Sequence, residues 1–398
     1  MDRAFENHAS YIGRPASELP TPSLIVDLPV LRRNVNTLHE NVEKLGIGFR
    51  PHVKTLKTLE ITRLMIAGGK HRSIIASTIC EIRSCLPLVK EGLLDEASPT
   101  LQPHWRCCAS ILYGLPIYPG ALQDLVKLRE IVRILLLVDN EEHIDILEKS
   151  GTQTWDVFIK LDVGSHRAGI PANSTALQKL VERADRSSAV NISGFYCHAG
   201  HSYAGRSMDE AQKTLETEIS SVLNAAALLP ADRTLIASIG ATPTAHVVQY
   251  LKANIPSNVK VELHAGNFPC NDLQQVSTGL VSDTDQAIRV AAEVCGVYPE
   301  RNEALVNAGV VALSRESSGY SGFGRVIGKS AWAVVRLSQE HGILGTDESE
   351  RVGENFKIGQ RVNLYCNHSC ITAAAFYVYF GVDENDIVRE AWIPWKGW

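Results

Sequence analysis

The sequence of 398 residues lacks the features of membrane and secreted proteins. It contains no window of about 18 consecutive apolar residues, the length that a membrane-spanning helix requires. Its start, "MDRAFENHAS", lacks the basic residues followed by an apolar stretch that form a signal peptide. We therefore expect a cytosolic protein with no membrane partner.

Concentrated basic charge and regularly spaced cysteines are also absent. The formal net charge is −5, and no run of Lys and Arg provides the basic face that nucleic-acid binding requires. Nine cysteines are an odd number, and they show no repeated short spacing. This excludes the usual disulfide framework of a small secreted protein. We predict no nucleic-acid partner and mostly small, buried thiols.

The chain lacks the common nucleotide-binding signatures, but it has a regular alternation of strand-like and helix-like segments. Asp27 can cap a helix with apolar residues spaced by three and four, and Gly46 can end it. Other segments with helical spacing are 121–132, 174–184 and 208–229. The short apolar runs are 49–54, 73–78, 109–114, 133–139, 157–164, 192–200, 234–240 and 260–267.

Eight strands, each followed by a helix until the last, predict an α/β protein with a (β/α)8 TIM-like barrel. An open doubly wound sheet fits the same alternation. However, no G-x-G-x-x-G follows the first strand, and G-x-x-x-x-G-K-[ST] is absent. The barrel is therefore the favoured fold.

The pattern changes after about residue 270, where Val, Ala and aromatic segments alternate with Gly, Ser and acidic clusters. Segments 286–299, 303–314, 331–343 and 361–382 have this all-β composition. We predict a barrel over residues 22–272 and a second, mostly β domain over residues 273–398 together with 1–21.

In a barrel of this type, catalytic groups gather at the carboxyl ends of the strands. Lys54 ends the first predicted strand, although most lysines are solvated surface residues. Small residues in "IGATPT" (239–244) and "HAGN" (264–267) follow strands seven and eight, where barrels often bind phosphate. A lysine together with a phosphate site suggests pyridoxal 5′-phosphate, which forms a Schiff base with the amine.

Seven segments together resemble one family. They are "RPHVKT" (50–55), "HRAG" (166–169), "GFYCHAGHSY" (194–203), "GATPT" (240–244), "ELHAGN" (262–267), "SQEHG" (338–342) and "NHSC" (367–370). In this order they are similar to the eukaryotic-type, metal-dependent D-serine dehydratases, which belong with the alanine-racemase-like pyridoxal-phosphate enzymes of fold type III. The resemblance covers nearly the whole chain and implies a barrel, a β domain and a homodimer.

The resemblance also implies roles for individual residues. Lys54 would bind the cofactor covalently and then remove the Cα proton of the substrate. Arg167 would face the phenolic oxygen of the cofactor ring. The other expected cofactor-binding residues are Tyr196, Tyr203, Thr242, Thr244, Gly266 and Asn267. Taken alone, Tyr196 could equally be a core aromatic residue, and Arg167 could be part of a surface ion pair.

A metal site is expected at "NHSC", where His368 and Cys370 are two residues apart. In a strand, residues i and i+2 point to the same face, so both side chains could bind one ion. Imidazole and thiolate together favour Zn²⁺ over Mg²⁺ or Ca²⁺. The resemblance implies that this Zn²⁺ helps hydroxide to leave Cβ of D-serine, so that the products are pyruvate and ammonia. The β-rich domain would carry this site.

Three other functions remain open as alternatives. A D-threonine-type aldolase would share the fold, but its relatives tend to have His-x-Asp where this chain has His368 and Cys370. A D-3-hydroxyaspartate dehydratase would differ only in the group on Cβ of its D-amino acid substrate. A non-catalytic pyridoxal-phosphate-binding protein is usually a lone barrel. The chain departs from its relatives at Leu56, where histidine is common, and in "FPCNDLQQ" after Asn267.

Overall fold

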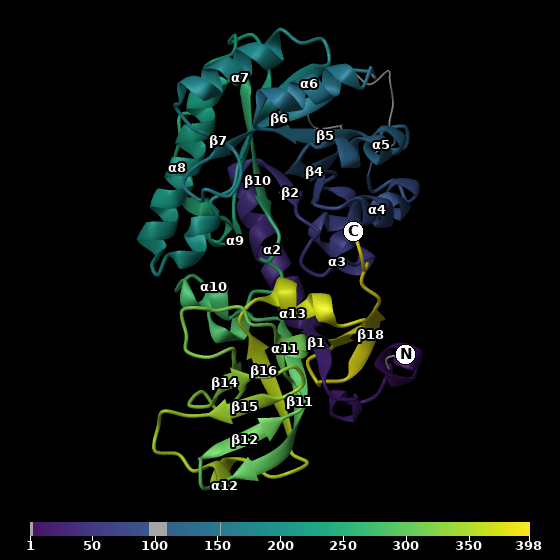
Figure 1. Ribbon diagram of the computed structural model, residues 1–398, viewed down its shortest axis with the longest axis vertical. Helices are drawn as coiled ribbons and strands as arrows, with labels where there is room; N and C mark the ends of the chain where they lie inside the picture. Colours follow the sequence, from purple (N-terminus) through teal and green to yellow (C-terminus); the bar gives the residue numbers. More distant parts are fainter. Residues whose placement is uncertain (1–2, 95–109, 152) are drawn as a thin grey trace. The chain divides into compact units, whose positions relative to one another are not determined.

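The computed structural model describes residues 3–94, 110–151 and 153–398, and the chain separates into two compact units (Figure 1). The barrel unit comprises Thr37–Gly266 and Trp395–Trp398. The β-rich unit comprises Met1–Asn36 and Asn267–Pro394. One division between the units falls within helix α2 (Leu28–Leu45).

The barrel unit contains eight parallel strands in the order β2-β10-β9-β8-β6-β5-β4-β3. The sheet closes between β2 and β3, where His52 forms a bridge with Ile75 and the Val53 N–H donates to the Ile75 carbonyl at 3.0 Å. The predicted (β/α)8 barrel is therefore confirmed. The strands are β2 (Gly48–Pro51), β3 (Ile74–Ala76), β4 (Ile111–Pro116), β5 (Ile134–Val138), β6 (Trp155–Asp162), β8 (Val190–Cys197), β9 (Leu235–Ile239) and β10 (Val259–Ala265).

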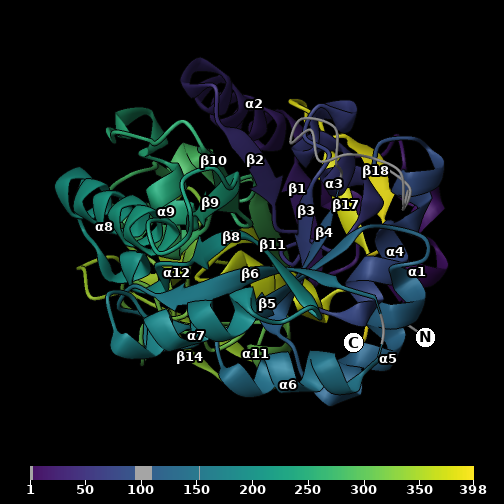
Figure 2. The ribbon, with the colours of Figure 1, turned by 90° about the horizontal axis from the view of Figure 1, so that it is seen from above.

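Helices surround these strands, as Figure 2 shows. Several begin at a Ser, Thr or Asn whose side chain accepts a hydrogen bond from the first turn, as Ser174 does from the Leu177 N–H and Ser207 from the Glu210 N–H. The expected helices over 121–132, 174–184 and 208–229 are present with shifted ends. The α-helices that follow α2 in this unit are α3 (Leu59–Met65), α4 (Ile79–Lys90), α5 (Pro119–Leu128), α6 (Glu141–Lys149), α7 (Thr175–Asp185), α8 (Met208–Ala226) and α9 (Thr242–Ala245).

The interior of the barrel changes from apolar to polar along the strands. Successive residues of a strand point to opposite faces, so alternate side chains fill the interior. Buried apolar residues including Leu135, Leu137 and Phe158 form one packed cluster with Tyr196. Nearer the carboxyl ends of the strands, the buried residues include the polar Lys160 and His264. This polar layer carries the candidate site.

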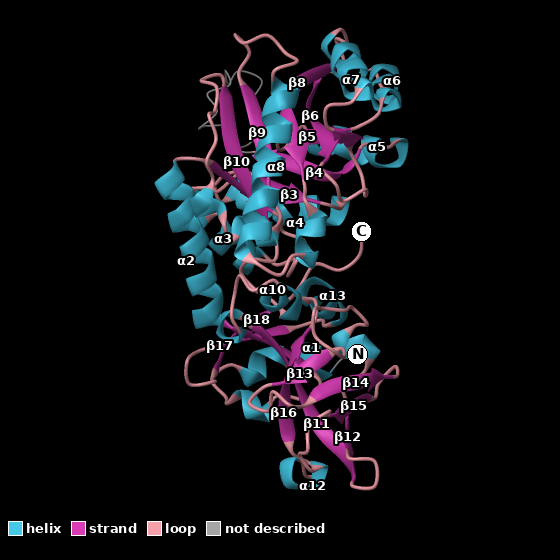
Figure 3. Cartoon of the chain, turned by 90° about the vertical axis from the view of Figure 1, so that its left-hand side faces the viewer, coloured by secondary structure: helices cyan, strands magenta, loops and turns pink. Residues whose placement is uncertain are grey.

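The β-rich unit contains a nine-stranded sheet in the order β12-β15-β14-β13-β16-β11-β1-β17-β18, and Figure 3 shows its strands in magenta. Because β11 also pairs with β12, six of these strands form a closed antiparallel barrel. The strands are β1 (Ser23–Asp27), β11 (Ile288–Tyr298), β12 (Glu303–Val306), β13 (Gly324–Val326), β14 (Ala333–Leu337), β15 (Gly342–Gly345), β16 (Arg361–Cys366), β17 (Tyr379–Val382) and β18 (Val388–Trp392).

Two stretches of the β-rich unit that we expected to be all-β contain short helices. These are α11 (Val310–Leu313) and α13 (Ser369–Ala375). The second has the sequence "SCITAAA", whose alanines favour helix. Its first N–H, from Ser369, donates to the buried Asp272 carboxylate at 2.9 Å, which stabilises the start of the helix.

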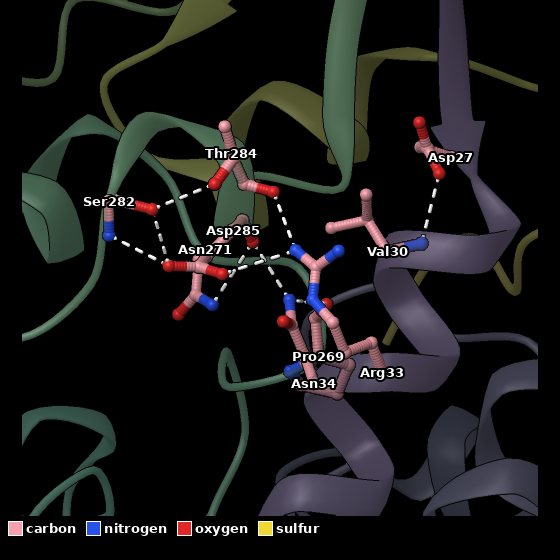
Figure 4. A network of polar contacts seen from close by, with 9 residues as sticks. All are labelled: Asp27, Val30, Arg33, Asn34, Pro269, Asn271, Ser282, Thr284 and Asp285. Atoms are coloured by element: carbon pink, nitrogen blue, oxygen red, sulfur yellow. Dashed lines mark hydrogen bonds and ion pairs between the residues drawn. The ribbon is translucent and has the colours of Figure 1, made fainter.

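Helix α2 has the two end residues that we predicted, Asp27 and Gly46. The Asp27 carboxylate accepts the Val30 N–H at 3.0 Å, and Gly46 follows the last helical residue with a positive φ. On the first turns of α2, Asn34 donates to the Pro269 carbonyl and Arg33 pairs with Asp285 at 3.1 Å (Figure 4). These contacts attach α2 to segments far along the chain.

The described residues can be examined for membrane-spanning helices and disulfides, neither of which the sequence led us to expect. No helix in these ranges has the length and apolar character to cross a bilayer. None of the seven cysteines in these ranges forms a disulfide, and four of them are buried. The remaining two, Cys107 and Cys108, lie outside the described residues.

Candidate active site

Lys54 lies in the turn that follows strand β2, at the carboxyl end of the barrel, and is half-buried. Its backbone N–H donates to Nδ1 of His52 at 3.3 Å. Because Nδ1 accepts this bond, Nε2 of His52 carries the proton and donates to the Ser77 hydroxyl at 3.0 Å. His52 therefore connects the turn containing Lys54 to the residue after β3. Two residues beyond Lys54, Leu56 is buried and apolar.

Neutral imidazoles surround this turn. Burial holds the pKa of His52 well below its usual value, and the charges of Lys54 and Arg167 add to the effect. Burial and the charge of Lys54 lower the pKa of His198 in the same way. Arg167 is exposed in the loop after β6, yet its charge acts on this group. The predicted Lys54 and Arg167 are thus electrostatically coupled to histidines that we did not predict as site residues.

Tyr196 lies inside the barrel on strand β8. Its ring stacks on the imidazole of His264, with centroids 4.2 Å apart and planes 7° apart. The Lys160 ammonium lies 4.7 Å from the centre of the same ring. Lys160 is only 4% exposed, and burial lowers its pKa to about 8. The barrel therefore holds a second buried amine beside a predicted cofactor-binding residue.

The predicted phosphate residues of the barrel unit lie at the ends of β9 and β10. Thr242 and Thr244 are buried in α9. At Gly240, which has φ +142°, an added Cβ would lie 2.1 Å from the His264 carbonyl oxygen, so only glycine allows this approach of the strands. At Gly266, an added Cβ would lie 3.3 Å from Cβ of His52. Glycines and buried hydroxyls are thus brought together at these strand ends.

Glu218 supports this site from helix α8, although sequence analysis did not single it out. It is fully buried and accepts the Ala199 N–H at 3.0 Å and the Gly240 N–H at 3.2 Å. Burial raises its pKa to about 7. The sequence contained one indication of this role. Glu218 lies between Leu215 and Ile219 among apolar residues at helical spacing, and a carboxylate buried there needs hydrogen-bond partners.

The other two predicted cofactor-binding residues are Tyr203 and Asn267. Tyr203 is half-buried in the short helix η4 (Gly200–Ala204). Asn267 begins the second segment of the β-rich unit, and its side-chain amide donates to the Asp272 carboxylate at 2.6 Å. The Asp272 carboxylate also accepts the Ser369 N–H. The Asn267 side chain therefore belongs to the polar network around α13.

The expected strand geometry of the metal site is wrong, because His368 is the N-cap of α13 and Cys370 lies in its first turn. The two side chains nevertheless interact, because a helix start also brings nearby residues together. Nδ1 of His368 lies 3.2 Å from the Glu316 carboxylate. Burial lowers the pKa of His368. The hydrogen bond with Cys370 and the nearby negative charges outweigh this effect and raise the pKa to about 9. Within the described ranges, no group of three or more His, Cys, Asp or Glu side chains is arranged to hold a metal.

The buried side-chain amide of Asn367 fixes the turn that carries His368. The Asn367 side chain donates to the carbonyls of Glu316 and Gly322 at 2.8 and 2.9 Å. Its amide oxygen accepts the Ser318 hydroxyl at 2.9 Å. His368 thus lies at a turn fixed by hydrogen bonds, close to Cys370, and imidazole and thiolate are side chains that can bind a cation such as Zn²⁺.

Two family descriptions match the chain. "Alanine racemase, N-terminal domain" matches residues 26–255, and "Putative serine dehydratase domain" matches residues 287–382. The chain is 39% identical to a D-serine dehydratase of Schizosaccharomyces pombe, across 98% of this chain and 94% of that protein. It is 33% identical to a D-serine dehydratase of Saccharomyces cerevisiae, across 98% and 99%.

The chain belongs to the alanine-racemase-like family that includes the D-serine dehydratases. A solved structure of this family, D-threo-3-hydroxyaspartate dehydratase from Delftia sp. HT23, superposes with a TM-score of 0.83. It is 26% identical and covers 96% of this chain and 100% of that one. A mutant of D-threo-3-hydroxyaspartate dehydratase has also been solved in a metal-free form. Membership of the family confirms the resemblance seen in the sequence and implies pyridoxal phosphate.

Proposed function

We propose that the protein is a D-serine dehydratase (D-serine ammonia-lyase), which converts D-serine to pyruvate and ammonia. The main support is the similarity to two D-serine dehydratases along almost the whole chain. The barrel adds a lysine at a strand end and a group of small, buried residues after β9 and β10. These are the parts that a lyase acting on an amino acid through pyridoxal phosphate needs.

The cofactor, when bound, supplies an electron sink for the negative charge left at Cα. Lys54 would hold it covalently and, once released by the substrate, its amine would take the Cα proton. Thr242, Thr244 and the backbone at Gly266 would bind the phosphate, with Asn267 contributing its backbone. Tyr196, Tyr203 and Arg167 would orient the ring. His52 and His198 are neutral, so they add no further positive charge beside the Lys54 amine that would take the proton.

The second proposed cofactor is Zn²⁺, held by His368 and Cys370. The positive charge of this ion would stabilise the hydroxide that leaves Cβ. The Glu316 carboxylate accepts from Nδ1 of His368, so Nε2 is the nitrogen left to bind a metal. The Cys370 thiol would bind as thiolate. The Asp272 carboxylate adds negative charge close to His368, which favours a cation at this turn.

Product analysis with D-serine and D-threonine tests this proposal. A dehydratase releases pyruvate from D-serine and 2-oxobutanoate from D-threonine. Glycine and acetaldehyde from D-threonine would instead identify an aldolase, and no product from either substrate would favour a non-catalytic role. D-3-hydroxyaspartate is the second candidate substrate, because a dehydratase of that compound superposes closely on this chain.

The oligomeric state and the cellular compartment are also part of this proposal. A homodimer is implied by the family resemblance, and sedimentation as a concentration-independent monomer would contradict it. Residence in the cytosol is also proposed, and imaging of a tagged chain would test it.

A further inference from the structure

Four polar side chains form a continuous chain across the interior of the barrel unit. Arg50 on β2 donates to both carboxylate oxygens of Glu262 on β10, at 2.7 and 3.2 Å. The Ser238 hydroxyl on β9 lies 2.9 Å from the Glu262 carboxylate and 3.1 Å from Nδ1 of His264. All four side chains are buried. His264 also stacks on Tyr196, so the chain ends at a residue assigned to the cofactor.

The donors and acceptors of this chain can be assigned. A carboxylate that receives two bonds from an arginine has no proton to donate, so Ser238 donates its one hydroxyl proton to Glu262. The Ser238 oxygen then accepts from Nδ1 of His264. His264 consequently carries its proton on Nδ1, and its Nε2 has a free lone pair. Nε2 is fully enclosed and has no hydrogen-bond partner among the described residues.

We propose that Arg50, Glu262 and Ser238 form a positioning relay that locks His264 as its Nδ1–H tautomer. In this state the imidazole gives Tyr196 a fixed surface to stack on and offers Nε2 as an acceptor in the cofactor site. His264 and Ser238 are positioning residues in this scheme. The link to the cofactor rests on the proposed function, whereas the tautomer itself does not.

The charges around His264 are compatible with a neutral ring. Burial lowers its pKa well below the usual value, and His198, Lys160 and Arg50 act in the same direction. The facing groups are Arg50 from β2, Lys160 from β6, Tyr196 from β8, His198 directly after β8, and Ser238 from β9, with Glu262 on its own strand. Because Arg50 and Lys160 are both positively charged, a proton on both nitrogens of the buried ring would be opposed.

Nitrogen-15 NMR of histidine-labelled, cofactor-free protein tests the tautomer without any reference to activity. The His264 signals are identified by their loss in His264→Gln. We expect the Nδ1–H form at pH 7, although free imidazole side chains in water favour Nε2–H. In Ser238→Ala the Nε2–H form should become populated, and in Ser238→Thr the Nδ1–H form should return. A wild-type His264 that is protonated on Nε2 or on both nitrogens would overturn the relay.

Binding of pyridoxine 5′-phosphate, which has no aldehyde and cannot react with Lys54, tests the link to the cofactor. We expect Ser238→Ala to weaken its binding roughly tenfold, as loss of one hydrogen bond allows, and Ser238→Thr to restore it. Ser220→Ala, which removes an exposed hydroxyl from α8, is the control. Unchanged affinity in a Ser238→Ala protein whose tautomer has switched would refute positioning. Failure of the wild type to bind this probe would refute the proposed function instead.

Discussion

The pKa values of three buried histidines in the barrel unit and of His368 in the β-rich unit are shifted in opposite directions. Burial lowers the pKa of His52, His198 and His264 in the barrel, and neighbouring cations reinforce the effect. In the β-rich unit, Cys370 and nearby carboxylates raise the pKa of His368 to about 9 despite its burial. The barrel thus provides neutral hydrogen-bonding groups beside a lysine, whereas the β-rich unit provides a site that favours a cation.

The two sites also differ in how the backbone holds them. Lys54, Tyr196 and His264 are on or directly after strands of one parallel sheet. His368 and Cys370 lie at the start of a seven-residue helix whose position depends on side-chain contacts from Asp272 and Asn367. We infer that the units have separate tasks, which variants in each unit should separate.

The largest expected effect is the loss of covalent cofactor and activity in Lys54→Ala. Removing the residue that would both hold the cofactor and move the Cα proton should lower pyruvate formation by about a thousandfold or more. Absorbance of the protein-bound cofactor at the violet end of the visible range reports the covalent bond to Lys54. Lys70→Ala, which changes an exposed lysine, is the control. Covalent cofactor in Lys54→Ala would show that the barrel assignment is wrong.

The second effect concerns the β-rich unit alone. Cys370→Ala should lower activity by about a hundredfold or more, because the metal loses one of two protein ligands. Zinc content per protein should fall, whereas the cofactor absorbance of the barrel should stay. Cys295→Ala is a matched control, because Cys295 is an exposed cysteine of the same unit. Equal zinc content in both variants would exclude Cys370 as a ligand.

A third effect concerns stability and belongs to the barrel. Glu218 has a pKa of about 7 in the folded chain against 4.5 as its ordinary value, so the folded state holds a proton that the unfolded state releases. Stability should therefore fall as pH rises from about 4.5 to 7, by about 3 kcal/mol in total. Denaturant unfolding of the cofactor-free protein at several pH values measures this loss.

Glu218→Gln should remove that part of the pH dependence, because its amide oxygen can still accept the Ala199 and Gly240 N–H groups. Glu216→Gln, at an exposed position of the same helix, should leave the dependence unchanged. If wild type and Glu218→Gln lose stability in parallel between pH 4.5 and 7, Glu218 is not the titrating group.

The smallest expected effect lies in the β-rich unit, at the start of α2. Asp27→Ala removes the acceptor of the Val30 N–H and should destabilise the protein by about 1 kcal/mol. Asp27→Asn, which keeps a capping oxygen, should recover most of this loss. Thermal unfolding measures both. Activity at a temperature far below unfolding should not change, and a large loss of activity would place Asp27 in the catalytic machinery.

The sequence was sufficient to predict the barrel because each of its strands is a short apolar run between helix-forming segments, as in "RILLLVD" for β5. It did not predict α13, since an alanine-rich stretch between two strands resembles a continuous β segment. The start of α13 depends on Asp272, which is 97 residues away from Ser369 in the chain. Local patterns carry no information about such a contact.

The candidate site shows the same limit. Lys54, Thr242, Thr244 and Gly266 could be proposed from strand ends and small residues. Glu218 and the chain from Arg50 to His264 could not, because their roles depend on partners that only the fold brings together. Arg50 and Glu262, for example, are 212 residues apart.

The most direct test of the account is removal of metal from the protein that carries its cofactor. If the barrel holds the cofactor and His368 with Cys370 holds Zn²⁺ for the departure of hydroxide, a chelator should abolish pyruvate release from D-serine. It should also leave the absorbance of the Lys54-bound cofactor largely unchanged, and added Zn²⁺ should restore turnover. Pyruvate formation at the full rate by metal-free protein would contradict the proposed role of the β-rich unit.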